Sequence, residues 1–106
     1  MALPELTDEQ RRQALAKAAE ARQVRAEVKN RLRHSGATVA QVLAEAKRNE
    51  AIAKIKVLDL LQSIPGIGKL TAQQIMDDLK IAQSRRLRGL GANQAKVLIA
   101  EIARRG

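Results

Sequence analysis

The segment of this chain from Thr7 to Arg33 contains neither glycine nor proline. It is dominated by Ala, Arg, Lys, Glu and Gln, which are all strong helix formers. Thr7 and Gln10 have the spacing of a capping box, and Asp8 and Glu9 occupy the first turn, where the helix dipole favours negative charge. The segment predicts one helix of roughly 26 residues, about 39 Å long at 1.5 Å per residue.

This helix is amphipathic only in its second half. Before position 21 its apolar residues are mostly alanines, so we expect that half to project into solvent. From position 21 an apolar stripe at helical spacing runs beside a basic stripe displaced by one residue. The apolar stripe is Ala21, Val24, Val28 and Leu32, and the basic stripe is Arg22, Arg25, Lys29 and Arg33. Gly36 predicts the end of the helix.

The rest of the chain also predicts helices. Strand-like alternation and the Asn-Gly or Asp-Gly turns of hairpins are absent. Thr38 with Gln41 repeats the capping-box spacing and predicts a helix that ends near Asn49. Apolar residues at helical spacing predict another helix from residue 52 to 63. We therefore expect an all-α fold, with a helical arm at residues 1–36 and a small helical domain at residues 37–106.

The composition excludes several functional classes. The 106 residues include no Cys, Phe, Trp or Tyr and a single histidine, His34. Without cysteine there is no disulfide, thiol nucleophile or iron–sulfur cluster, and one histidine argues against a zinc site. Without aromatic rings the chain cannot stack on exposed bases. We expect no metal, no cofactor and no catalytic residue.

The charge of the chain points to a polyanionic partner. The formal net charge is +9, and residues 64–106 hold 8 basic and 3 acidic side chains. No apolar run approaches the ~20 residues of a membrane span, and the first residues lack the pattern of a secretory signal. These features predict a soluble cytoplasmic protein that binds no membrane and no small-molecule substrate.

The strongest motif is Pro-Gly-Ile-Gly-Lys at residues 65–69. Pro65 ends the preceding helix, and Gly66 can take the positive φ that reverses the chain. A new helix is predicted from Lys69, and its first N–H groups, which lack partners inside the helix, can bind a phosphate. Gly68 leaves room for a close approach of the backbone. The candidate DNA-binding residues of this turn are Gly66, Ile67, Gly68 and Lys69.

This motif has the pattern of a helix-hairpin-helix, which grips a nucleic-acid backbone without reading its sequence. A Walker-type phosphate loop is the competing glycine motif, but its GxxxxGK[ST] spacing is missing. An ordinary tight turn with a capping glycine is the structural alternative. The side chains predicted to pack between the two hairpin helices are Ile64, Ile67, Leu70 and Ile75.

A second basic segment at residues 84–91 follows the hairpin. It carries three arginines in four positions, with Leu87 and Leu90 as expected anchors, before a final helix that begins near Ala92. A guanidinium can enter a narrow minor groove and donate several hydrogen bonds there. The candidate DNA-binding residues of this segment are Arg85, Arg86, Arg88 and Gly89. The alternative is a solvated loop whose arginines pair with Asp77, Asp78 and Glu101.

A helix-hairpin-helix followed by a longer connection and a third helix resembles the helix-two-turn-helix module of a small-subunit ribosomal protein and of base-excision glycosylases. The chain as a whole is similar to the actinobacterial integration host factor family. The similarity is carried, in order, by MALPxLTxEQR, RAEVKNRLRHSGA, IKVLDLLQSIPGIGK and SRRLRGLG.

The resemblance implies a nucleoid-associated protein that binds duplex DNA with little sequence preference, bends it, and contributes to chromosome organisation and integration. It implies that the amides of residues 66–68 and Lys69 hold phosphates, and that the arginines of SRRLRG lie at the minor groove. The basic stripe of the long helix is expected to be a second, weaker DNA surface. With no Phe for a wedge, the bend must come from charge neutralisation, from inserted arginines, or from an aliphatic wedge such as Leu87 or Leu90. We expect a monomer in solution.

Three alternatives remain on the sequence alone. A ribosomal-protein-like binder of structured RNA shares the hairpin architecture, although such proteins usually end in a long basic tail. A basic helix lying on anionic lipid fits residues 8–33, but the bulky apolar residues that bury in the interface are missing. An enzyme would need a companion acid and a pocket beside a lysine such as Lys56, Lys69 or Lys80, and neither is visible.

Overall fold

The computed structural model describes residues 7–105 and is all-α, as the sequence predicts. The long helix α1 spans Asp8–His34 and measures about 40 Å for its 27 residues. The Thr7 hydroxyl accepts a hydrogen bond from the Gln10 N–H, and the Gln10 side chain accepts one from the Thr7 N–H. The predicted capping box and the predicted end of the helix are both confirmed.

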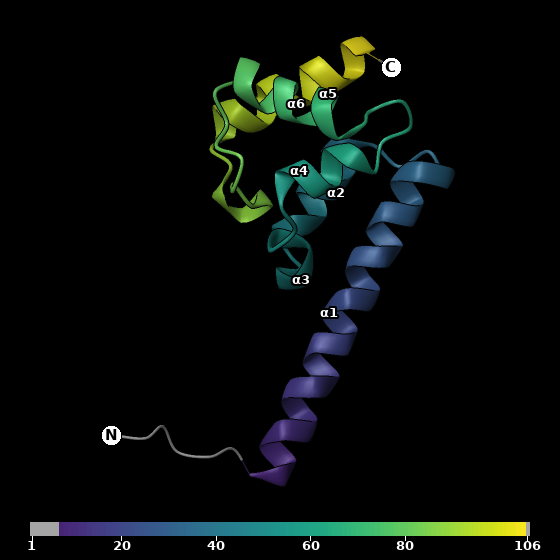
Figure 1. The fold of residues 1–106 in the computed structure, drawn as a ribbon, viewed down its shortest axis with the longest axis vertical. Helices are drawn as coiled ribbons and strands as arrows, with labels where there is room; N and C mark the ends of the chain where they lie inside the picture. Colours follow the sequence, from purple (N-terminus) through teal and green to yellow (C-terminus); the bar gives the residue numbers. More distant parts are fainter. Residues whose placement is uncertain (1–6, 106) are drawn as a thin grey trace.

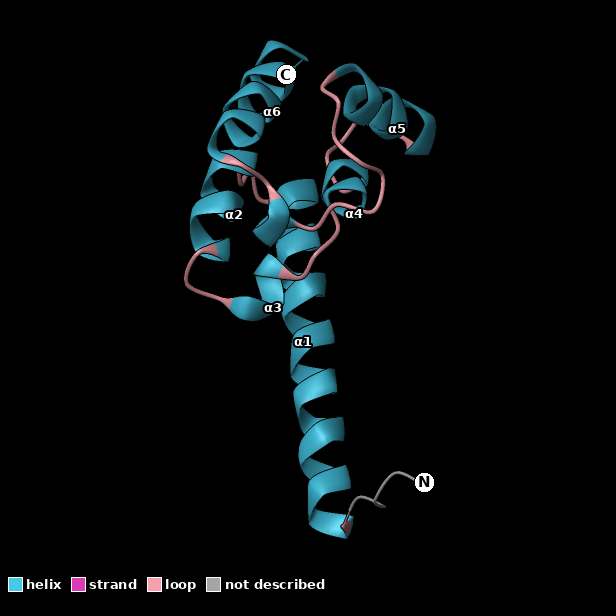
Figure 2. Ribbon diagram, turned by 90° about the vertical axis from the view of Figure 1, so that its left-hand side faces the viewer, coloured by secondary structure: helices cyan, strands magenta, loops and turns pink. Residues whose placement is uncertain are grey.

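Six shorter elements follow α1 in the described residues. They are α2 (Val39–Ala46), α3 (Glu50–Ala53), α4 (Val57–Gln62), α5 (Lys69–Asp78), the 3₁₀ helix η1 (Leu87–Gly89) and α6 (Ala92–Arg105). Figure 1 shows α1 as a rod whose upper half runs beside the other helices and whose lower half extends past them. Figure 2 shows two helix pairs at the upper end of α1, α2 with α6 on the left and α4 with α5 on the right.

A single apolar core joins the elements. It takes at least one side chain from every helix and from η1, and α4 and α5 contribute most of the residues with no exposed surface. The core residues are Val28, Leu32, Val39, Val42, Ile52, Ile55, Val57, Leu60, Leu61, Ile67, Ala72, Ile75, Met76, Ile81, Leu87 and Leu98. Because the hairpin helices and η1 share this core, the two basic motifs are held in a fixed relation to each other.

The two halves of α1 differ sharply in their surroundings. Every residue from Thr7 to Glu20 is exposed, whereas Val28 and Leu32 belong to the core. This confirms that the first half projects into solvent and that the apolar stripe packs. The division into an arm at residues 1–36 and a domain at residues 37–106 stays a prediction; residues 1–6 and 106 lie outside the described part.

An ion pair fixes the packed half of α1 to α2. The Arg31 guanidinium donates two hydrogen bonds to the Glu45 carboxylate, at 2.8 and 2.6 Å. The bond from Arg31, opposed by burial and reinforced by the attraction of the opposite charges, lowers the pKa of Glu45, and the pKa of Arg31 is raised in turn. Sequence reasoning did not find this pair, because its members lie on different helices.

The helix predicted from residue 52 to 63 is wrong in one respect. α3 ends at Ala53 and α4 begins at Val57, with an extended segment between them. The Val57 N–H donates to the Arg85 carbonyl at 2.9 Å, and the Leu87 N–H donates to the Ile55 carbonyl at 2.9 Å. These two bonds form an isolated antiparallel bridge between Lys56 and Arg86. The bridge replaces the helical hydrogen bonds that a continuous helix would have made here.

The predicted end of the second helix near Asn49 is also late. α2 ends at Ala46, and the Asn49 side chain caps the next helix by accepting a hydrogen bond from the Ala51 N–H at 3.0 Å. Asparagine at this position therefore begins α3 rather than ending α2.

Candidate nucleic-acid interface

The turn between α4 and α5 has the geometry that the sequence predicts. The Ile67 N–H donates to the Ile64 carbonyl at 3.1 Å, and Gly66 has a φ of 86°. Proline at the second position and a positive φ at the third are the features of a type II turn. Ile67 is buried beneath the turn, so the backbone that follows it is held against the core.

The first turn of α5 is open to an anion. Gly68 is its N-cap, and no side chain caps it. Within residues 7–105 no loop carbonyl accepts from the N–H groups of residues 68–71. A Cβ at Gly68 would meet nothing within 4 Å, so the packing of the fold does not require a glycine at this position. Lys69 is exposed beside these amides, which makes the turn suited to a phosphate.

One of the residues predicted to pack in the hairpin does not do so. Leu70 is 81% exposed, because α5 turns the face with Ala72, Ile75 and Met76 towards the core. Ile67 and Ile75 are buried and Ile64 is partly buried, as predicted. Leu70 therefore lies on the outer surface next to the open amides.

The arginine segment is folded onto the core rather than loose. Leu87 is 4% exposed and anchors η1, while Leu90 is partly buried against the core. The Arg85 guanidinium donates to the Gly89 carbonyl at 2.9 Å, and that of Arg86 donates to the Lys54 carbonyl at 2.6 Å. Both arginines are thus held in place by neutral acceptors, which leave their charges uncompensated.

Gly89 permits the close packing of Arg85. A Cβ at position 89 would lie 3.0 Å from the Arg85 Cδ, too close for an unshifted side chain. A larger residue here would require the Arg85 side chain to shift by a few tenths of an ångström. The role that this contact supports for Gly89 is to position Arg85.

The alternative in which the arginines pair with nearby carboxylates is not observed. In the described part of the chain Glu101 pairs with Arg104 and Arg105, both on α6. Asp77 accepts from the Gln83 amide at 3.1 Å. None of the ion pairs within residues 7–105 includes Arg85, Arg86 or Arg88. The positive charge of the segment remains available for an external anion.

The basic stripe of α1 lies on a different element from these two motifs. Arg22 and Arg33 are exposed, and Arg25 and Lys29 are partly buried beside the face that packs on the domain. In the view of Figure 1, α3 lies between α1 and the segment that carries η1. The arginine segment lies at the start of α4, where Arg86 pairs with Lys56, and the hairpin turn follows its other end. The end of α1 lies nearer the turn, since Leu32 lines one cavity with Ile64.

Two basic residues that the sequence did not single out for binding adjoin the motifs. Lys56 lies opposite Arg86 in the isolated bridge. Arg105 lines a groove with Pro65, Gly66 and Ile67, beside the hairpin turn. The sequence carries no strand pattern that reveals the bridge, and Arg105 looks like an ordinary helix-terminal cation.

Comparison with known proteins decides the family. A family model described as "S13-like H2TH domain" matches residues 32–102. The chain is 56% identical, over 106 residues, to the integration host factor of Streptomyces coelicolor, a match that covers 100% of this chain and 99% of that protein. The chain belongs to the actinobacterial integration host factor family.

Further members agree in sequence and in structure. The integration host factors of Mycolicibacterium smegmatis and Mycobacterium tuberculosis are each 54% identical over 99 residues, covering 93% of this chain and 94% of those proteins. A solved structure described as "Structure of sIHF bound to an 8bp palindromic DNA" matches with a TM-score of 0.79 at 55% identity. It covers 81% of this chain and 97% of that one. The predicted family and the predicted helix-two-turn-helix fold are confirmed.

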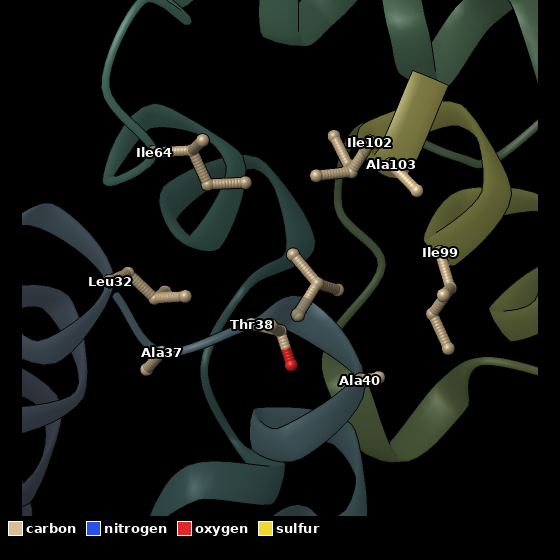
Figure 3. A pocket seen from close by; sticks show the side chains of 9 residues that line it. Leu32, Ala37, Thr38, Ala40, Ile64, Ile99, Ile102 and Ala103 are labelled. Carbon is tan, nitrogen blue, oxygen red and sulfur yellow. The ribbon is translucent and has the colours of Figure 1, made fainter. Parts of the chain in front are cut away.

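The integration host factor fold of this chain also contains an apolar cavity. It has a volume of about 370 Å³ and lies between the end of α1, the start of α2, the end of α4 and α6. Figure 3 shows Leu32, Ile64, Ile99 and Ile102 around it. No charged side chain lines it, so it is unsuited to a phosphate, although Ile64 and Ile102 also line the groove beside the hairpin turn.

Residues 7–105 contain neither a metal-binding cluster nor a membrane-spanning helix. No group of three or more His, Cys, Asp or Glu side chains is placed to hold a metal ion. Among the helices of this range, none is both long and apolar enough to cross a membrane.

Proposed function

We propose that the protein binds duplex DNA with low sequence specificity, through phosphate and minor-groove contacts. The observation that carries this proposal is the uncapped first turn of α5 on the same core as three arginines without carboxylate partners. Support comes from the relatives named integration host factor and from the similar structure described as bound to DNA. The protein acts in the nucleoid, in the cytoplasm, where it bends DNA and supports chromosome organisation and integration.

The phosphate contact is made by the turn of residues 66–69. The free N–H groups at the start of α5 donate to phosphate oxygens, aided by the positive end of the helix dipole. Lys69 adds a full positive charge within the same turn. Gly66 and Ile67 shape this turn, Gly68 keeps its surface open, and none of these contacts depends on the identity of a base.

The groove contact is made by the arginine segment. Arg85 and Arg86 are anchored at their carbonyls, and Arg88 is exposed on η1. A narrow minor groove has an enhanced negative potential that attracts such guanidinium groups. Arg88 is the arginine best placed to enter it, because no bond to a neighbouring carbonyl holds it back in the described residues.

The burial of Leu87 and Leu90 limits which residues can bend the DNA. Leu87 is 4% exposed and cannot leave the core to separate two base pairs, so it is not the wedge. Leu90 is only partly buried and remains a candidate wedge. Bending then comes from phosphate neutralisation on one face of the duplex, from the inserted arginine, or from Leu90.

The basic stripe of α1 provides a second, weaker DNA surface in this proposal. Arg22 and Arg33 are exposed, Arg25 and Lys29 are half-buried, and all four lie within a continuous helix that offers no free N–H groups at these positions. The arm of residues 1–36 then adds nonspecific attraction, while the domain of residues 37–106 fixes the position of the duplex. One copy of the chain suffices for both surfaces.

An RNA-binding function is the alternative that shares this architecture, since the matching family model is S13-like. DNA is favoured because the chain matches integration host factors over nearly their whole length and because the similar structure is described as bound to DNA. The same relatives support the prediction that the chain is not an enzyme.

Salt-dependent binding tests the proposal. Six or so phosphate contacts predict that log K falls with log[salt] at a slope of about −5 on a mixed-sequence duplex. Structured RNA of equal length should bind more weakly in the same mobility-shift assay. An affinity that does not change with salt concentration, or that is higher for the RNA than for the duplex, contradicts the proposal.

Gly68→Val sharpens this test. The added side chain meets nothing in the folded protein, so helicity and melting temperature should stay near those of the wild type. It projects where the phosphate lies and should weaken binding at least about tenfold, the loss of one charge-assisted contact. Equal affinity in the folded variant contradicts a phosphate at this turn.

A further inference from the structure

The isolated bridge places two cations directly opposite each other. The bonds from the Val57 N–H to the Arg85 carbonyl and from the Leu87 N–H to the Ile55 carbonyl flank the pair Lys56–Arg86. In an antiparallel ladder this is the pair without hydrogen bonds between its own two residues, in which side chains approach most closely. Both residues are exposed.

Like charges in this position are destabilising, and a neighbouring carboxylate is the usual remedy. None is found in residues 7–105, where the ion pairs involve Arg31, Lys54, Arg104 and Arg105. Glu50 pairs with Lys54 at 3.5 Å, and Asp59, three residues after Lys56, makes no ion pair in this range. The two charges therefore face solvent without a counter-charge from the described chain.

The position of Arg86 is fixed by further contacts. Its guanidinium donates to the Lys54 carbonyl at 2.6 Å, and the next residue, Leu87, is buried in the core. Lys56 immediately precedes α4, whose Val57 has no exposed surface. The backbone thus fixes two cationic residues opposite each other, with no ion pair to either in residues 7–105, and this arrangement is suited to binding an anion.

We propose that Lys56 and Arg86 together form a second phosphate-binding site, which holds the DNA backbone beside the groove that Arg88 enters. This inference rests on the proposed function. The six residues of α4, about 9 Å of helix, separate the site from the hairpin turn, so the two sites bind different phosphates. Arg86 is then a backbone contact, and the three arginines do not share one role.

The test compares Lys56→Gln with Lys80→Gln and Lys56→Arg. Lys80 is also an exposed lysine and is no member of the Lys56–Arg86 pair, so its variant loses the same charge without removing a residue of the proposed site. Affinity for a mixed-sequence duplex is measured by fluorescence anisotropy across a salt series. Thermal unfolding of the free proteins is followed at low salt.

Lys56→Gln should bind roughly five- to tenfold more weakly than the wild type at 0.1 M salt, with a slope smaller by about 0.9, the value for one lost phosphate contact. Lys56→Arg should bind like the wild type, and Lys80→Gln should keep the slope. Free Lys56→Gln should melt at or above the wild-type temperature, because the repulsion is relieved. This last result excludes a loss of affinity through unfolding.

The outcomes separate the two proposals. If the wild type binds with the expected slope and Lys56→Gln matches Lys80→Gln, the second site is wrong while the proposed function stands. If Lys56→Gln binds weakly but also melts well below the wild type, Lys56 has a structural role and the site is again wrong. If the wild type does not bind the duplex, both proposals fail.

Discussion

The two halves of α1 form one continuous helix but have opposite environments. Leu15, in the first half, is 67% exposed, whereas Leu32, in the second, is 5% exposed and packed in the core. Both halves carry several basic residues, and they form one continuous helix. Helix propensity therefore does not distinguish the two halves. They differ in charge and in apolar pattern, because residues 8–20 hold three basic and three acidic side chains and residues 21–34 hold five basic and one acidic.

The same contrast separates the α1 stripe from the hairpin and arginine segment. Arg85 and Arg86 are positioned by carbonyls on a shared core, and the amides of α5 are fixed by the turn below them. The stripe offers charges on a helix surface, with long side chains that must be ordered on binding. Because its donors are fixed in place, we expect the domain to be the principal DNA surface.

The largest expected effect comes from removing the three arginines of the segment. Arg85→Ala, Arg86→Ala and Arg88→Ala together should weaken duplex binding roughly a thousandfold, at about 1.4 kcal/mol for each charge-assisted contact. Arg22→Ala with Arg25→Ala, on α1, should cost no more than about tenfold. Mobility shift measures both, with circular dichroism as the check of helicity. Equal losses of duplex affinity from the two sets of variants would show that the arginine segment binds DNA no more strongly than α1.

The next effect is on stability. Leu32→Ala should lower the free energy of unfolding by about 3 kcal/mol, because it leaves a cavity in the core. Leu15→Ala should change it by less than about 0.5 kcal/mol, since its side chain already contacts water. Urea unfolding of both variants gives the comparison. A large loss from Leu15→Ala would show that the first half of α1 packs on something.

The smallest effect concerns the ion pair that fixes α1 to α2. The pKa of Glu45 is lowered in the folded state by the Arg31 hydrogen bond, so the pair stabilises the protein above the unfolded pKa of the carboxyl. That stabilisation is lost as the pH falls through the lowered folded pKa. Both side chains retain solvent contact, so Glu45→Gln should cost about 0.5 kcal/mol at neutral pH. The difference between variant and wild type should vanish in acid; a constant difference would exclude this linkage.

Much of the fold could be predicted from local signals. The capping boxes at Thr7 and Thr38 lie within four residues of chain, and so does the turn at Gly66, which is why their positions were predicted correctly. The break between α3 and α4 could not be found this way. It depends on hydrogen bonds to Arg85 and Leu87, some thirty residues away, and no periodicity records them.

The basic motifs of the site could be predicted from the sequence, but the contacts that hold their side chains in place could not. The sequence identified the turn and the three arginines as basic motifs, yet gave no sign that Arg86 bonds to the Lys54 carbonyl or that Lys56 faces it. Leu70 was misassigned to the core because the face that α5 turns inward depends on its packing against α4. Contacts between distant segments decided each of these points.

The most direct test of a principal surface on the domain is amide mapping by NMR. A short mixed-sequence duplex is titrated into the ¹⁵N-labelled protein, and chemical-shift changes are assigned by residue. The account predicts the largest changes at the amides of residues 66–71 and 85–89, smaller ones along the α1 stripe, and none at residues 8–20. The account would be contradicted if the largest chemical-shift changes fell in α1 and the shifts of the turn amides did not change.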